Sequence, residues 1–180
     1  MSGGLGTWIK TASRRYKNFL VLAFLLSACG LCGSFFAQYV MKLTPCVMCI
    51  AQRVSMALTA ALGVAAFFGG WSRRWVSTAY AALLSIPSGY GLVVAIQQLR
   101  LMAMPADRVP LCGPGFNMLW EKHPFLEFLQ VVLRGDGDCA KPLYMLGAPI
   151  PVWSLLFFSL ILLSVWGGFF IARFEKRAKP

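Results

Sequence analysis

Charged residues are scarce in this chain of 180 residues, and acidic residues are scarcer still. Charged residues make up 13% of the sequence, and only six are aspartate or glutamate. Soluble domains carry about a quarter charged residues, so this scarcity excludes an ordinary water-soluble fold. The chain also has a single histidine, His123, and lacks both the C-x-x-C-H haem motif and a glycine-rich fingerprint after a strand. These absences exclude an attached c-type haem and a dinucleotide-binding domain.

Long apolar runs dominate instead. Hydrophobic residues make up 58% of the sequence, and the mean hydropathy is +0.68. A helix needs about 20 apolar residues to cross about 30 Å of hydrocarbon, and four runs are long enough. They cover approximately residues 19–39, 49–68, 75–96 and 153–172. The sequence therefore predicts an all-α integral membrane protein, with one membrane domain over residues 1–180 folded as a four-transmembrane-helix bundle.

Some runs and loops have local features of their own. The first run is too long for the apolar region of a cleavable signal peptide, so we expect it to remain as a span. In the third run, Pro87, Gly89 and Gly91 predict a kink that neighbouring helices accommodate. In the last loop, 125-FLEFLQVVL-133 predicts a short helix. This helix either lies in the outer membrane interface or packs on the bundle.

The basic residues predict the orientation of the spans. The formal net charge is +11, and basic clusters with little balancing acid precede the first run, join the second to the third, and follow the fourth. The positive-inside rule therefore places both termini in the cytoplasm and two loops, approximately residues 40–48 and 97–152, outside. In a bacterium this means the inner membrane, with both loops in the periplasm. No basic stripe is interleaved with aromatics, so we expect lipid and no nucleic acid as a partner.

The six cysteines fall into two groups by depth. Cys29 and Cys32 lie inside the first run, and the other four lie on the outer side: Cys46, Cys49, Cys112 and Cys139. The two C-x-x-C pairs, Cys29 with Cys32 and Cys46 with Cys49, are spaced along the chain like zinc ligands. If the residues from Cys32 to Cys46 were helical, however, they would span about 21 Å. A tetrahedral site needs all four sulfurs about 2.3 Å from one metal. We therefore expect no metal, and we interpret Cys29 and Cys32 as small residues that allow close helix packing.

The stretch 44-TPCVMCIAQR-53 combines features that activate a thiol. Pro45 suits the first turn of a helix, which puts Cys46 and Cys49 in the opening turns with Arg53 on the same face. A helix N-terminus and a nearby arginine both stabilise the thiolate, the reactive form of cysteine. A charge just inside the membrane is unfavourable without a partner. The alternative role of Arg53 is a side chain that snorkels to the interface.

Electron exchange through this pair needs a donor and an acceptor. Cys112 and Cys139 lie in the polar, turn-forming stretches LCGPG and RGDGDCAKP, on the side where disulfides persist. A second disulfide there can carry electrons from a soluble partner. Because the chain has no built-in cofactor motif, a lipid-soluble quinone is the natural acceptor at the bilayer edge. Gln38 and Gln52, near the level of the C-x-x-C pair, are either hydrogen-bond donors to a ligand or interface residues.

These motifs together carry a family resemblance. With PCVMCIAQR at the second run, a cysteine in LCGPG and GDCA before the last run, the chain resembles the disulfide bond formation protein B (DsbB) family along its whole length. The resemblance implies an inner-membrane thiol–quinone oxidoreductase that reoxidises a periplasmic DsbA-like oxidase, with ubiquinone or menaquinone as cofactor. It implies that Cys46, Cys49, Cys112 and Cys139 are catalytic, and that Arg53 and Cys49 contact the quinone.

The resemblance also implies a cycle of thiol exchange. A thiolate of the reduced partner attacks Cys112 and frees Cys139. Cys139 then attacks Cys46, which makes a bridge between the loops and releases Cys49 as a thiolate. Cys49 passes electrons to the quinone while Arg53 stabilises the charge, and the disulfides reform.

The sequence departs from the family in two places, and two other classes of function stay open. Gln52 stands where the best-known member has an acid, which bears on how the quinone headgroup is hydrogen-bonded, and the pair Cys29 and Cys32 is additional. A four-span scaffold with purely structural disulfides is the main alternative, although it gives Arg53 no role beneath a C-x-x-C. A thiolate metal transporter would need carboxylates and histidines along an ion path, and the apolar runs lack them.

Overall fold

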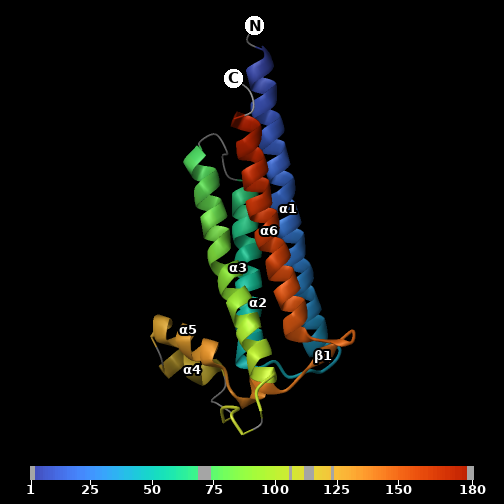
Figure 1. The fold of residues 1–180 in the computed structure, drawn as a ribbon, viewed down its shortest axis with the longest axis vertical. Helices are drawn as coiled ribbons and strands as arrows, with labels where there is room; N and C mark the ends of the chain where they lie inside the picture. Colours follow the sequence, from blue (N-terminus) through green and yellow to red (C-terminus); the bar gives the residue numbers. More distant parts are fainter. Residues whose placement is uncertain (1–2, 69–73, 106, 112–115, 123, 178–180) are drawn as a thin grey trace.

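Long helices dominate the computed structural model, which describes residues 3–68, 74–105, 107–111, 116–122 and 124–177 (Figure 1). The helices are α1 (Gly3–Tyr39), α2 (Val47–Phe68), α3 (Arg74–Met102), α4 (Phe116–Lys122), α5 (Phe125–Arg134) and α6 (Ile150–Arg177). A 3-10 helix, η1, covers Gly137–Ala140. The strands β1 (Tyr144–Met145) and β2 (Ala148–Pro149) form an antiparallel hairpin.

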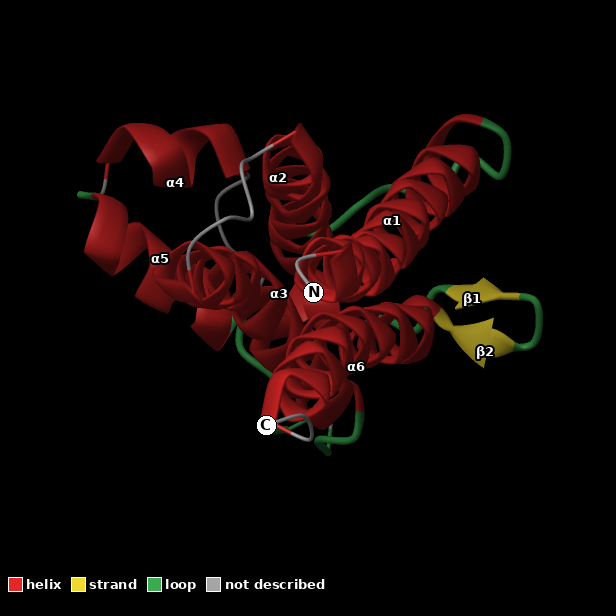
Figure 2. Cartoon of the chain, turned by 90° about the horizontal axis from the view of Figure 1, so that it is seen from above, coloured by secondary structure: helices red, strands yellow, loops and turns green. Residues whose placement is uncertain are grey.

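Among the described residues, four helices are long and apolar enough to cross a membrane. Their spans are Asn18–Tyr39, Val47–Phe68, Thr78–Met102 and Ile150–Ile171. They form a closed ring in which α1 and α3 each pack between α2 and α6 (Figure 2). Large apolar side chains cover the outside of this ring, as a lipid-facing surface requires. The prediction of an all-α, four-span membrane protein is confirmed.

Glycine lets the helices of this ring approach closely. A Cβ added to Gly91 of α3 would lie 2.2 Å from the Phe158 ring of α6, and one added to Gly30 of α1 would lie 2.8 Å from the Met56 sulfur of α2. Lipid chains are as apolar as the side chains, so van der Waals contact of this kind holds membrane helices together. The helix α3 is continuous through Pro87, one of the residues expected to kink it.

The third span is longer at its C-terminal end than the sequence predicts. The helix α3 continues to Met102, so the prediction that residues 97–102 belong to the loop is wrong. No proline lies between Pro87 and Pro105, so the backbone can stay helical past residue 96. The buried amide of Gln98 also finds a hydrogen-bond partner in Gln52 of α2. A polar side chain whose hydrogen bonds are satisfied inside the bundle does not need to leave the helix.

The short elements gather at the end of the bundle away from the start of α1 and the end of α6 (Figure 1). The helix α5 buries Phe128 and Val132 against α2, where they meet Val47 and Ala51. The segment 125–133 is therefore helical as expected. One face of it packs on the bundle, whereas Phe125 and Leu126 are exposed.

Candidate functional site

Three cysteines gather at the N-terminal end of α2. Cys46 ends the first loop, and its carbonyl oxygen accepts a hydrogen bond from the N–H of Ile50 at 3.1 Å. Cys49 lies in the first turn of α2, and its sulfur accepts from the Cys46 thiol at 3.3 Å. Cys139 of η1 is fully buried in the same cluster. The expected position of Pro45 in the first turn is wrong, because α2 begins at Val47.

Two residues before η1 bring Cys139 to this position. Gly135 has φ 67° and ψ −178°, a backbone conformation that is essentially restricted to glycine. A Cβ there would lie 2.6 Å from Leu101 Cδ1 and 2.8 Å from Met48 Cε. The Asp136 carboxylate then caps η1 by accepting from the Cys139 N–H at 3.1 Å. The missing side chain at position 135 therefore lets the long loop return tightly against α2 and α3.

A buried pair of amides contacts the thiols from the side of α3. Gln52 Nε2 donates to Gln98 Oε1 at 2.9 Å. Gln98 Nε2 in turn donates to the sulfurs of Cys46 and Cys49, each at 3.5 Å. Hydrogen bonds of this kind are stronger when the acceptor is charged, so they favour a thiolate over a thiol. The sequence analysis did not identify Gln98. The feature that could have indicated it is an amide side chain at the end of the third apolar run, at about the same membrane depth as the C-x-x-C pair.

The environment of Cys46 keeps its thiol protonated. Cys46 lies just outside the membrane-spanning segment Val47–Phe68. Its hydrogen bond with Cys139, its hydrogen bond to Cys49 and its burial raise the pKa of the Cys46 thiol above the usual range. Negative charge in this cluster is therefore better carried by Cys49, which lies in the first turn of a helix where an anion is favoured.

Arg53 reaches from α2 to α1. Its Nε donates to the Ser34 hydroxyl, its Nη1 to Gln38 Oε1, and its Nη2 to the Ser34 carbonyl oxygen at 3.0 Å. The guanidinium has five N–H donors, so N–H groups beyond these three remain for a ligand. The centre of the guanidinium also lies 5.4 Å from the Phe35 ring centroid. Gln38, whose role the sequence leaves open, here accepts from Arg53 and fixes its orientation.

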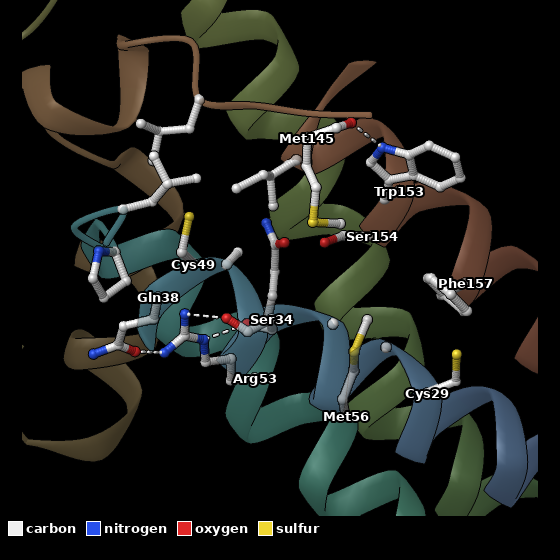
Figure 3. Close-up of a pocket in the computed structure, with 18 of the residues that line it drawn as sticks. Cys29, Ser34, Gln38, Cys49, Arg53, Met56, Met145, Trp153, Ser154 and Phe157 are labelled. Carbon is white, nitrogen blue, oxygen red and sulfur yellow. Dashed lines mark hydrogen bonds between the residues drawn. The ribbon is translucent and has the colours of Figure 1, made fainter. Parts of the chain in front are cut away.

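A cavity of about 230 Å³ lies between α1, α2, α6 and the hairpin (Figure 3). Cys49 and Arg53 both line its α2 wall. Much of the remaining lining is apolar and includes Leu43, Met56, Leu143, Met145, Ile150 and Phe157. Trp153 Nε1 donates to the Met145 carbonyl oxygen at 2.9 Å, which ties the hairpin to the start of α6 beside the cavity.

The lining of this cavity fits a quinone headgroup. A quinone ring has two apolar faces and two carbonyl oxygens that accept hydrogen bonds. Met56 and Phe157 supply apolar surface, Arg53 supplies charged N–H donors, and Cys49 supplies a thiol in the same wall. A mostly apolar concave site with a few polar groups is the usual form of a small-molecule site.

The structure brings together most of the residues expected at the site. Cys46, Cys49 and Cys139 form one cluster, and Arg53 lies at the cavity beside Cys49. Cys112 and His123 lie outside the described residues.

The prediction that Cys29 and Cys32 serve close packing is wrong, because both side chains are exposed. Gly30 makes the close helix contact instead, against Met56. Cys29 lines the cavity, at the end away from Cys49 (Figure 3). Residue size alone favoured packing for both cysteines, whereas the rotation of α1 about its axis places Gly30, and neither cysteine, against Met56 of α2.

Known proteins resemble this chain over most of its length. Residues 16–167 match the family described as Disulfide bond formation protein DsbB. Disulfide bond formation protein B of Neisseria meningitidis serogroup B is 36% identical over 151 residues, which cover 84% of this chain and 93% of the relative. The protein of that name from Marinobacter nauticus is 40% identical over 142 residues, with coverages of 78% and 84%. The one from Hahella chejuensis is 35% identical over 168 residues, with coverages of 92% and 97%. No solved structure matches the chain significantly.

Proposed function

This chain belongs to the disulfide bond formation protein B family, and on that premise we propose that it is a membrane thiol–quinone oxidoreductase. It reoxidises a periplasmic DsbA-like dithiol oxidase and passes the electrons to ubiquinone or menaquinone. The four apolar spans agree with a multi-pass membrane protein. We further propose the bacterial inner membrane as its location, with the thiol cluster on the periplasmic side.

One observation carries this proposal: Cys49 belongs both to the thiol cluster and to the cavity wall. Its sulfur accepts from Cys46 at 3.3 Å on one side, and on the other it lines the cavity together with Arg53. A purely structural disulfide needs no ligand cavity beside it. A residue shared by both features can pass electrons from protein thiols to a small acceptor.

The thiol chemistry follows from the order of the cysteines. A thiolate of the reduced partner attacks Cys112 of the Cys112–Cys139 disulfide, which forms a mixed disulfide and releases Cys139 as a thiolate. Cys139 attacks Cys46 of the Cys46–Cys49 disulfide, which forms a Cys46–Cys139 bridge and releases Cys49. The second partner thiol then displaces Cys112, so the partner leaves oxidised.

The loop disulfide is restored by the reverse exchange within the chain. The Cys112 thiolate attacks Cys139, which releases Cys46 and leaves Cys46 and Cys49 as the reduced pair. Cys46 takes up a proton that the partner dithiol has given up, and the negative charge stays on Cys49, supported by the Gln98 amide and by Arg53. A bound quinone supplies the oxidising equivalent, because it takes two electrons and two protons and leaves as the quinol.

The proposal is tested by mixing membranes that contain the protein with a reduced thioredoxin-fold dithiol and a short-chain ubiquinone or menaquinone. We expect dithiol oxidation that depends on quinone and is abolished by Cys49→Ser. Cys32→Ser is the matched control, because Cys32 is exposed and does not line the cavity, so its rate should equal that of the unmodified protein. Turnover that survives Cys49→Ser, or a rate independent of quinone, would support the structural scaffold instead.

A further inference from the structure

Ser154 presents a buried hydroxyl to the cavity from α6. Its side chain is 8% exposed and lines the cavity, and no partner is found for the hydroxyl among the described residues. Three other buried serines of the bundle behave differently. The hydroxyls of Ser27, Ser88 and Ser164 each donate to a carbonyl oxygen of their own helix, at 2.9, 2.8 and 2.8 Å. Among the described residues, the Ser154 hydroxyl is therefore an unpaired donor at a cavity wall.

An unpaired hydroxyl is costly at this depth of the protein. Buried polar groups are nearly always hydrogen-bonded, and a hydrocarbon surrounding offers no partner in their place. A single water is a poor substitute, because an ordered buried water needs two to four polar partners. The cavity residues nearest to Ser154 along α6 are Ile150, Trp153 and Phe157, which offer no side-chain acceptor. Gln52 also lines the cavity, but no hydrogen bond joins its amide to Ser154 among the described residues. A ligand in the cavity can therefore supply the missing acceptor.

Ser154 and Arg53 lie on opposite walls of the cavity (Figure 3). Arg53 extends from α2 and keeps N–H groups free beyond its bonds to Ser34 and Gln38. A 1,4-quinone carries its two carbonyl oxygens at opposite ends of the ring. Its polarity therefore matches a cavity with a charged donor on one wall and a neutral donor on the other.

Resting on the proposed function, we propose that Ser154 binds the quinone headgroup by donating a hydrogen bond to the ring carbonyl that lies away from Arg53. The two donors then fix the ring between α2 and α6, so that Cys49 meets it in one orientation. Arg53 supplies charge at the end beside the thiol, and Ser154 sets the position of the far end. This assigns to Ser154 a binding and orienting role for the acceptor.

The test compares variants that differ only in this hydroxyl. Ser154→Ala and Ser154→Val lack it, whereas Ser154→Thr keeps it with the branched shape of valine. The control is Ser55→Ala, because Ser55 is also a buried serine with no recorded side-chain bond among the described residues, yet it does not line this cavity. A short-chain ubiquinone is titrated into each protein in its oxidised form, and the infrared carbonyl bands of ¹³C-labelled quinone are recorded.

We expect Ser154→Ala and Ser154→Val to raise the Kd for quinone about three- to tenfold, as the loss of one neutral hydrogen bond does. One carbonyl band should move to higher frequency, while Ser154→Thr and Ser55→Ala should match the unmodified protein. If the unmodified protein binds and uses quinone but Ser154→Val shows the same Kd and the same bands, Ser154 has no such role. If the unmodified protein itself shows no quinone-dependent dithiol oxidation, the proposed function fails instead.

Discussion

At the scale of single residues, the site depends on how charge is divided between two neighbouring sulfurs. Cys46 is enclosed by Cys139 and Cys49, and its pKa is raised. Cys49 accepts hydrogen bonds from Cys46 and Gln98 and lines the same wall as Arg53. The proton and the charge therefore have different preferred positions, although the two thiols are only three residues apart.

We predict that alkylation of Cys46 in the reduced protein begins at a higher pH than for an ordinary cysteine. Free thiols ionise near about pH 8.5, and only the thiolate reacts. A raised pKa lowers the thiolate fraction at every pH, so the midpoint of the rate moves upward. The measurement is iodoacetamide labelling over a pH series, followed by mass spectrometry. Cys139→Ser removes the largest cause of the raised pKa, so it should bring the midpoint down. If the labelling rate of Cys46 in the unmodified protein had the same pH midpoint as an ordinary cysteine, the enclosure of Cys46 by Cys139 and Cys49 would be contradicted.

A second prediction at this scale concerns Arg53. Arg53→Ala should raise the KM for quinone about ten- to hundredfold, the cost of losing a charged hydrogen bond. The KM of Arg53→Lys should lie between those of the unmodified protein and Arg53→Ala, because lysine keeps the charge but lacks the planar arrangement of N–H donors. Steady-state kinetics with a reduced dithiol and varied quinone provide the measurement. If Arg53→Ala left the quinone dependence unaltered, Arg53 would instead be an interface anchor.

At the scale of elements, the return of the long loop decides whether the thiols meet. The η1 segment is held by Gly135 and by the Asp136 cap, and both act through backbone conformation. Sequence patterns could assign α2 and its C-x-x-C because helix periodicity is local. They could not assign the end of α3, because the hydrogen-bond partners of its Gln98 amide, Gln52 and the sulfurs of Cys46 and Cys49, all lie outside α3.

We predict that Gly135→Ala slows formation of the Cys46–Cys139 bridge. The added methyl group meets Leu101 and Met48, and the backbone conformation is unfavourable for alanine. Strain of about 1 kcal/mol or more should lower the yield of the bridge about fivefold or more. The bridge is formed with a mild oxidant in a Cys49→Ser background and measured by peptide mapping.

The matched control for that variant is Gly147→Ala. Gly147 also has a positive φ, +81°, but a Cβ there has no neighbour within 4 Å. It should therefore carry backbone strain in the hairpin without displacing Cys139. An equal bridge yield in the two variants would show that the fit of Gly135 against α2 and α3 does not position the thiol.

At the scale of the whole molecule, the two ends of the bundle differ. The start of α1 and the end of α6 lie at one end, and α4, α5 and the hairpin lie at the other (Figure 1). The thiols of Cys46, Cys49 and Cys139 cluster beside the start of α2. The basic clusters of the sequence belong to the first end, and five of the six acids belong to the loop at the second. The chain thus separates the two kinds of charge from which the positive-inside rule predicts an orientation.

We predict that the loop end faces outward. In a cysteine-free protein, Arg108→Cys should react with a membrane-impermeant maleimide in intact cells, because the Arg108 side chain is 78% exposed. A cysteine introduced at Lys176, beyond the last span, should react only after the membrane is permeabilised. Labelling of the Lys176 position in intact cells would show that the protein has the opposite orientation.

The sequence by itself determined the features that depend on neighbouring residues. Four apolar runs of sufficient length, the basic flanks, and a C-x-x-C with an arginine four residues after its second cysteine can all be read locally. The tertiary structure decided which groups meet: Cys139 with Cys46, Gln98 with both sulfurs, and Ser154 with the cavity that Cys49 and Arg53 share. These meetings depend on the rotation of each helix about its axis and on the closure of a long loop. Both are fixed by packing between segments far apart in the chain, such as Gly30 against Met56 and Gly135 against Leu101.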